Sequence, residues 1–366
     1  MLGPDSYVPV KTGIDVLIAE DFRALRDARI ALVANRTATS ADGRRSTDIL
    51  ATNDELYLDR IFWAGEHAPA YPEDLPVIEV HPAARRIAAE DLHGLDALLI
   101  DVQEPGCRFS PCVDLLGQAL AACCAANVLC YILDRPNPLD GLTVEGPSSE
   151  AGPAMPSAYP LPIRHGMSIG ELARLLNQDA EDPAKLRVVG MAGWERQFLF
   201  EHTGLSWIPP LSGLTTPPTA ASYAALQLLS DSNLSLGQGT DAPYELLGAP
   251  WIDATALSNE LSAREIPGAR FDPASFRARV DGREADCQGV RITIEQLQEF
   301  SPAHLALSLI EILRARHPRH WRYQGLAGLL ARADLLEAIE DQADELDQLW
   351  VPDPDFFDAR AKALIY

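Results

Sequence analysis

Five short, largely apolar runs lie in the first part of the chain, and helix-like or polar segments separate them. The runs span residues 30–34, 58–63, 76–80, 97–102 and 128–133. Strands of this kind belong to mostly parallel sheets that helices cover on both faces, because both sides of each strand are then buried. The pattern predicts an α/β fold built on a Rossmann-like, doubly wound, mostly parallel sheet.

The remainder of the chain predicts a second, smaller α/β domain. With 366 residues, of which 47% are hydrophobic, the chain is long enough to form two domains. A proline-rich passage that ends at Pro162 marks the transition from the first domain to the second. We therefore predict a Rossmann-like domain at 1–150 and a C-terminal domain at 151–366 that completes a cleft. The other predicted elements are strands at 186–191 and 289–294 and helices at 220–229, 255–263, 303–316 and 335–349.

Composition bears on the class of partner. The 53 acidic and 30 basic residues give a formal net charge of -23, and no Lys/Arg cluster is present that would follow a phosphate backbone. Gln118 and Asn127 interrupt the least polar stretch, residues 115–133, which argues against a membrane span. We expect a soluble protein that neither binds nucleic acid nor inserts into a membrane, and its oligomeric state stays open.

The N-terminus and the cysteines bear on the compartment. Residues 1–7 lack the basic segment and apolar core of a secretion signal. The cysteines are bunched, and two are adjacent, which suits reduced thiols better than disulfides. They are Cys107, Cys112, Cys123, Cys124, Cys130 and Cys287. We expect a cytoplasmic protein, with a periplasmic or secreted one as the alternative if a signal peptide has been removed.

Neither a cofactor nor a metal is expected. The first strand continues into Asn35, Arg36 and Thr37 without a glycine, so a pyrophosphate cannot approach the backbone as it does in dinucleotide-binding folds. No segment has the spacing of a triphosphate-binding loop. Cys107 and Cys112 lack nearby histidines or further cysteines that would complete a zinc site.

Polar side chains follow several of the predicted strands, at the sheet edge where α/β folds bind ligands. Glu66 and His67 come directly after the second run and are the leading catalytic pair, although a helix-start carboxylate and an ordinary loop histidine would look the same. The other strand-end candidates suit a ligand rich in hydroxyl groups. They are Asn35, Asp101, Gln103, Arg108, Asp134, Arg135 and Asn137.

Two further motifs have both a binding and a structural interpretation. Arg164 and His165 precede a predicted helix with Ser168 as its N-cap, a favourable place for an anion, or they brace the domain junction. Asn233 lies in a loop at 232–240, and with Trp251 it supplies the amide and the aromatic ring that sugar recognition uses. Trp251 fits a core position equally well.

Several of these segments, taken in order, resemble the signature blocks of the bacterial exo-acting β-N-acetylmuramidases, long catalogued as a domain of unknown function. The similarity runs from about Gly13 to Tyr366. The blocks are Glu66-His67, Gln103 with Gly106 and Arg108-Phe109, residues 133–138, 144–147, 162–167 and 248–253, and the terminal 364–366.

The resemblance implies a cleft that takes the non-reducing end of a peptidoglycan fragment, such as a muropeptide, and a hydrolysis that releases N-acetylmuramic acid. It also implies Glu66 as the catalytic acid, with His67 holding it in place. Cleavage of a glycosidic bond needs a second group, for which the candidates are Asp101, Glu104 and Glu145. Arg164 is the candidate for the lactyl carboxylate of the substrate.

This chain departs from the family pattern in several predicted loops. Ala64, Ala68 and Pro69 replace the usual neighbours of the Glu-His pair, and the loops at 209–215, 230–233 and 237–240 have lost charged, aromatic or amide groups. A non-hydrolytic relative that binds a cell-wall or other anionic saccharide is therefore the alternative function.

Overall fold

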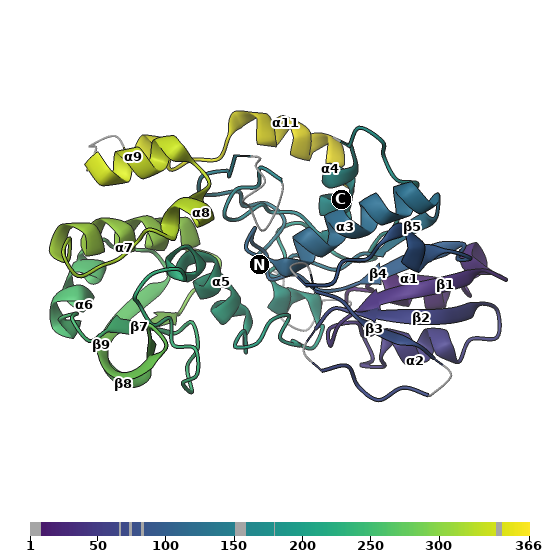
Figure 1. Cartoon of the computed structure of the whole chain (residues 1–366), viewed down its shortest axis with the longest axis horizontal. Coiled ribbons are helices and arrows are strands. Elements are labelled where there is room, and N and C mark those ends of the chain that lie inside the picture. The colour runs from purple at the N-terminus through teal and green to yellow at the C-terminus, as the bar shows by residue number, and fades with distance from the viewer. Residues whose placement is uncertain are drawn as a thin grey trace.

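A six-stranded parallel sheet forms the larger half of the molecule (Figure 1). The computed structural model describes residues 9–65, 67–72, 75–81, 84–150, 159–178, 180–341 and 346–366. The strands are β1 (Arg29–Ala34), β2 (Tyr57–Trp63), β3 (Val77–Glu79), β4 (Ala97–Asp101), β5 (Leu129–Leu133) and β6 (Leu186–Val189). Their order is β3-β2-β1-β4-β5-β6, so the chain reverses direction across the sheet between β1 and β4. The predicted strands and the doubly wound sheet are confirmed.

Helices cover both faces of this sheet. Alternate residues of a strand point to opposite faces, so Ala31 and Val33 pack with α3 (Pro111–Ala126), α4 (Ile169–Gln178) and α11 (Pro354–Ala363). On the other face, Ile30 and Leu32 pack with α1 (Gly13–Ala19) and α2 (Ser46–Ala51). Strands buried on both sides explain why their sequences are continuously apolar.

Strand β6 follows position 150 in the chain and pairs with β5, Cys130 opposite Leu186. The predicted division at residue 150 therefore falls between two strands of one sheet. The predicted capping box at the start of α4 is confirmed, since Ser168 N donates to Glu171 Oε2 and Glu171 N donates to Ser168 Oγ.

The second half is built on a three-stranded antiparallel sheet in the order β7-β9-β8. Its strands are β7 (Leu246–Ala249), β8 (Ala269–Val280) and β9 (Arg283–Ile294), and its helices are α5 (Pro217–Leu226), α6 (Ala254–Ala263), α7 (Pro302–Arg316), α8 (Leu326–Leu330), α9 (Ala333–Asp341) and α10 (Leu346–Leu349). Figure 1 shows this half beside the parallel sheet, with α11 running between the two and returning the C-terminus to the first half.

The β8–β9 hairpin is longer than the sequence analysis predicted, because only residues 289–294 were expected as strand there. Asp281 and Gly282 form its tip with φ of 52° and 75°. Two successive left-handed residues make the turn that matches the twist of a hairpin, and Asp-Gly is a preferred sequence for it. The alternation of exposed and buried residues along both strands was a strand signal that the prediction did not use.

No helix within the described ranges is long and apolar enough to cross a lipid bilayer.

The C-terminal residue is anchored in the first half by a buried carboxylate. Tyr366 Oη donates to Asp134 Oδ2 at 2.6 Å, and Ser168 Oγ and Gly170 N also donate to this carboxylate. Burial raises the pKa of Asp134 to about 6, although the hydrogen bonds from Tyr366, Gly170 and Ser168 lower it. Asp134 thus favours folding most strongly below the unfolded pKa of about 3.9, and this contribution is lost as the pH rises through 6.

Replacing Tyr366 with Phe removes the hydroxyl donor that stabilises the charged form of Asp134. We expect Tyr366→Phe to lower the free energy of unfolding by about 2 kcal/mol at pH 8 and by clearly less at pH 5, where Asp134 is protonated. Urea denaturation at both pH values measures the difference. Tyr57→Phe, at a side chain that is 60% exposed, is the control. An equal loss at both pH values would contradict the role given to Asp134.

Candidate active site

The carboxyl ends of β1, β2 and β4 meet at one edge of the parallel sheet. Ala34 lies opposite Trp63 on one side and opposite Asp101 on the other, so the residues that follow these strands emerge together. Thr37 N donates to Asn35 Oδ1 at 2.9 Å, and Gln103 N donates to Thr37 Oγ1 at 2.9 Å. The loops after β1 and β4 are thereby tied to each other. Ligands bind at such a reversal point in open α/β sheets.

A narrow cavity opens beside these loops. It is lined by hydroxyl groups, one amide, one guanidinium and a few apolar side chains, among them Thr37, Thr39, Ser40, Gln103, Arg135, Phe200, Leu205, Ser206 and Ile208. Its volume of about 40 Å³ is far below the roughly 300–1,000 Å³ of sites that enclose whole small molecules. The cavity therefore has room for one substituent of a ligand, and the rest of the ligand has to lie outside it.

Arg135 is the only charged side chain among the described residues that line this cavity. Its Nε donates to Asp101 Oδ1 at 2.5 Å, and its Nη2 donates to the Thr39 carbonyl at 2.7 Å. Asp101 is fully buried and also accepts from Ser46 Oγ at 2.5 Å. The described part of the chain offers Nη1 no hydrogen bond. Arg135 is therefore held rigidly from one side and keeps one donor group for a ligand.

The predicted catalytic pair lies at the end of β2. Glu66 is outside the described residues. The preceding residue, Gly65, is beside the loop after β1, since a Cβ at Gly65 would lie 3.6 Å from Asn35 Cβ. His67 is exposed and has a φ of 46°, in the left-handed region. The chain that leads into position 66 is thus close to the polar edge of the sheet.

Glu145 and Arg164 join the two halves of the molecule. Arg164 Nη1 donates to Glu145 Oε1 at 3.0 Å, and its Nη2 donates to Asp140 Oδ2 at 2.9 Å and to the Leu139 carbonyl. Glu145 also accepts from Ser301 Oγ, the N-cap of α7. Arg164 is only 4% exposed. This geometry favours the bracing interpretation of Arg164.

Other predicted binding residues also point inward. Arg108 donates from Nη1 to the Pro147 carbonyl and from Nη2 to the Leu329 carbonyl, both at 2.8 Å, which links the first half to α8. Asn137 accepts from Leu139 N and donates to the Met167 carbonyl. Both residues are buried and hold loops in place.

Glu104 and His165 form a buried pair behind the sheet edge, with 3.4 Å between Glu104 Oε2 and His165 Nε2. Glu104 also accepts from Gly106 N, and His165 Nδ1 accepts from Met167 N. Neither side chain lines the cavity. Asn233 lies in the second half, where it contacts the backbone of residues 320 and 322.

The structure adds cavity residues that the sequence analysis missed. Thr37, Thr39 and Ser40 follow the predicted Asn35 by a few positions, and Phe200 and Ser206 come from a loop far along the chain. The hydroxyls after the first strand were a usable signal. The segment at 200–208 carries no motif, and its position depends on tertiary packing.

Comparisons with known proteins agree along most of the chain. Residues 30–217 match the family model described as exo-beta-N-acetylmuramidase NamZ, N-terminal, and residues 221–366 match the corresponding C-terminal model. The peptidoglycan beta-N-acetylmuramidase NamZ of Bacillus subtilis (strain 168) is 31% identical over 329 residues, which cover 86% of this chain and 80% of that protein.

Two solved structures of DUF1343 family proteins from Bacteroides fragilis NCTC 9343 are similar. One has a TM-score of 0.89 at 27% identity and covers 98% of this chain and 99% of its own. The other has a TM-score of 0.74 at 23% identity, with the same coverage, and supports the fold alone.

The buried ion pair of Asp101 and Arg135 predicts a strong energetic coupling. Removal of one partner leaves a buried charge uncompensated, so a double-mutant cycle with Asp101→Asn and Arg135→Gln should give a coupling of about 3 kcal/mol in urea denaturation. The exposed pair Arg45 and Asp48 is the matched control, with side chains 46% and 48% exposed, and its coupling should stay below about 1 kcal/mol. Similar couplings for the two pairs would contradict the role assigned to Asp101.

Proposed function

The chain belongs to the exo-β-N-acetylmuramidase family, and from that premise we propose that it hydrolyses peptidoglycan fragments and releases N-acetylmuramic acid from their non-reducing ends. The resemblance predicted from the sequence is confirmed by the family models and by the Bacillus subtilis relative. The protein is a glycoside hydrolase of two α/β parts. The residues that act in the site are assigned below as proposals.

Arg135 is the residue on which the proposed recognition of the substrate depends. N-acetylmuramic acid differs from N-acetylglucosamine by a lactyl ether that ends in a carboxylate. The cavity has the size of one substituent, and its only described charge is the free edge of Arg135. A guanidinium already oriented by Asp101 binds a carboxylate with little further loss of freedom. We assign the lactyl carboxylate to Arg135 rather than to Arg164, since the guanidinium of Arg164 already serves Glu145 and Asp140.

Hydroxyl and amide groups around Arg135 complete the recognition. Gln103 Nε2 is held by the Glu104 and Pro136 carbonyls, so its side chain has a defined orientation at the cavity wall. Thr37, Thr39 and Ser206 add side-chain oxygens to the same wall. Sugar hydroxyls both donate and accept hydrogen bonds, and such a mixed lining satisfies them.

Glu66 is the proposed catalytic acid, and His67 is its proposed positioning partner. Support comes from the position of Gly65 beside Asn35 and from the resemblance to the family's Glu-His block. Proton transfer from the acid to the leaving glycosidic oxygen is one of the two tasks in glycoside hydrolysis. Asp101, Glu104 and Glu145, the candidates for the second task, each serve an internal partner and do not line the cavity.

We also propose that the protein works in a reducing compartment such as the cytoplasm. All six cysteines are free thiols, and five of them are buried. Buried free thiols are typical of proteins that are not exposed to oxidising conditions.

Glu66→Gln tests the acid assignment, because the amide keeps the shape of the side chain but lacks a transferable proton. Turnover of a chromogenic N-acetylmuramide should fall by about 10²–10⁴-fold. The exposed Glu79→Gln on β3 carries the same chemical change and should retain wild-type turnover. Unchanged turnover in Glu66→Gln would overturn the assignment, and binding of N-acetylmuramic acid without turnover in the wild type would favour a saccharide-binding role.

The carboxylate assignment is tested with a pair of substrates, a chromogenic N-acetylmuramide and its lactyl methyl ester. The wild type should prefer the free carboxylate by roughly 10–100-fold in kcat/KM, the worth of a charged hydrogen bond. Arg135→Lys should lose most of this preference, whereas Arg164→Lys should keep it. The ratio of two substrates does not depend on the folded fraction of a variant. A preference that survives in Arg135→Lys and disappears in Arg164→Lys would reverse the assignment.

A further inference from the structure

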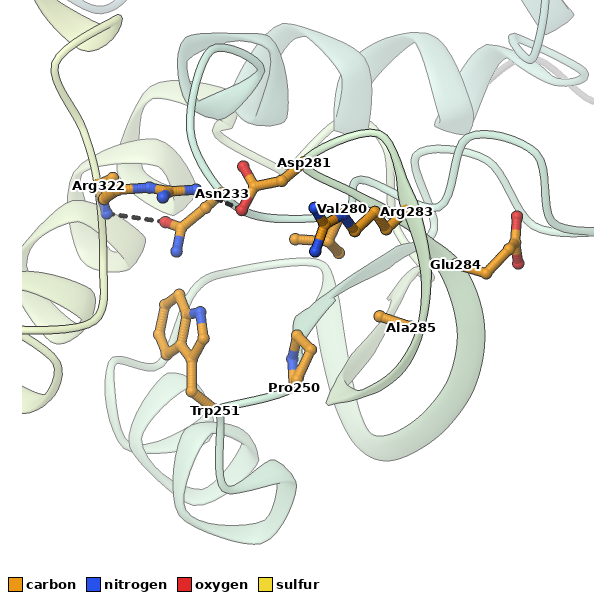
Figure 2. Close-up of a pocket in the computed structure, with 9 residues that line it drawn as sticks. All are labelled: Asn233, Pro250, Trp251, Val280, Asp281, Arg283, Glu284, Ala285 and Arg322. Carbon is orange, nitrogen blue, oxygen red and sulfur yellow. Dashed lines mark hydrogen bonds and ion pairs between the residues drawn. The ribbon is translucent and has the colours of Figure 1, made fainter.

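The second half of the molecule has a larger hollow of its own. It lies between the β8–β9 hairpin tip, the residues that follow β7 and the segment around Arg322, and its volume is about 610 Å³ (Figure 2). That volume falls within the roughly 300–1,000 Å³ of small-molecule sites. None of its lining residues lines the cavity beside Arg135.

Trp251 forms the aromatic wall of this hollow. Its indole packs edge-on against His317 at 4.9 Å and is stacked with His320 at 6.2 Å between ring centroids. Its Nε1 has no hydrogen-bond partner among the described residues. Figure 2 shows the indole across the hollow from the hairpin residues Val280 and Arg283. Because Nε1 is itself buried, the wall is a fixed aromatic ring with no accessible donor.

Asn233 supplies a fixed amide above this ring. Its Oδ1 accepts from Arg322 N at 2.7 Å, and its Nδ2 donates to the His320 carbonyl at 2.8 Å. The amide ties the loop that carries Asn233 to the segment around Arg322, and Asn233 is buried. One side of the hollow is therefore held in place by buried side-chain hydrogen bonds.

Most of the charged residues around the hollow form ion pairs, but one arginine has no partner. Arg322 pairs with Asp281, and Glu284 pairs with Arg277 at 3.6 Å. Arg283 is exposed and has no ion-pair or hydrogen-bond partner within the described part of the chain. In a chain with a net charge of -23, an unpaired guanidinium across the hollow from an aromatic wall favours an anionic ligand that also has a flat, partly apolar face.

We propose that this hollow is a second saccharide site, which binds a carboxylate-bearing pyranose through Trp251 and Arg283. The sugar ring packs on the indole, and the carboxylate pairs with Arg283. The choice of a muramic acid unit as the sugar rests on the proposed function. Such a site retains a peptidoglycan fragment, or a released sugar, outside the cleft where cleavage takes place.

Equilibrium dialysis with N-acetylmuramic acid tests this site by stoichiometry. The wild type should bind two equivalents, and Arg283→Gln should bind one, with at least a tenfold loss of affinity at the second site. N-acetylglucosamine, which lacks the carboxylate, should bind this site at least tenfold more weakly. Arg264→Gln, an equal charge change at an exposed arginine of the same half, should keep two equivalents.

Trp251→Ala removes the ring on which the sugar packs, and it should weaken the second equivalent without removing the first. A single equivalent in the wild type that Arg283→Gln binds with unchanged affinity, or two equivalents in Arg283→Gln at wild-type affinity, would overturn the proposal. An equal loss in Arg264→Gln would also overturn it, because the effect would then be general charge. Turnover of the chromogenic muramide reports on the proposed function separately. Two equivalents without turnover would support this site while the proposed function fails.

Discussion

Buried charge at the carboxyl edge of the parallel sheet is the constraint on which the rest of the structure depends. A charged group inside a protein is tolerated only when partners replace the lost water. Arg135 meets this requirement through Asp101, and Arg164 through Glu145 and Asp140. The same requirement fixes the loops that carry these residues, because each pair joins segments that are distant in the sequence. The edge is rigid before any ligand arrives.

These pairs divide the polar strand-end residues into two groups with different tasks. Arg164, Arg108 and Glu145 face inward and tie the parallel-sheet half to α7 and α8. Gln103, Thr37 and Arg135 line the cavity, each with part of its hydrogen-bonding capacity already used by the fold. A side chain that forms some of its hydrogen bonds within the protein is held in one orientation and can still form others with a ligand. The inward-facing residues therefore fix the positions from which the cavity-lining residues contact a substrate.

The difference between these groups marks the limit of what the sequence could predict. Apolar runs identified the strands, and the rule that parallel strands end at one edge brought Asn35, Gln103 and Arg135 together correctly. No pattern in the neighbouring sequence indicates whether a loop arginine points into the protein or toward a ligand. Arg108 contacts a carbonyl 221 positions later, and Ser301 reaches Glu145 across 156 positions. Such partners are set by the packing of two halves, as is the loop at 200–208 that closes the cavity.

A strongly acidic protein that takes an anionic sugar has to rely on short-range contacts. At physiological ionic strength charges are screened beyond about 8 Å, so the net charge of -23 opposes the approach of the substrate only weakly. Within a cavity the screening is smaller and a single guanidinium acts at full strength. Arg135, which is buried in the narrow cavity, meets this condition. Recognition then depends on which cations the fold leaves unpaired rather than on how many it contains.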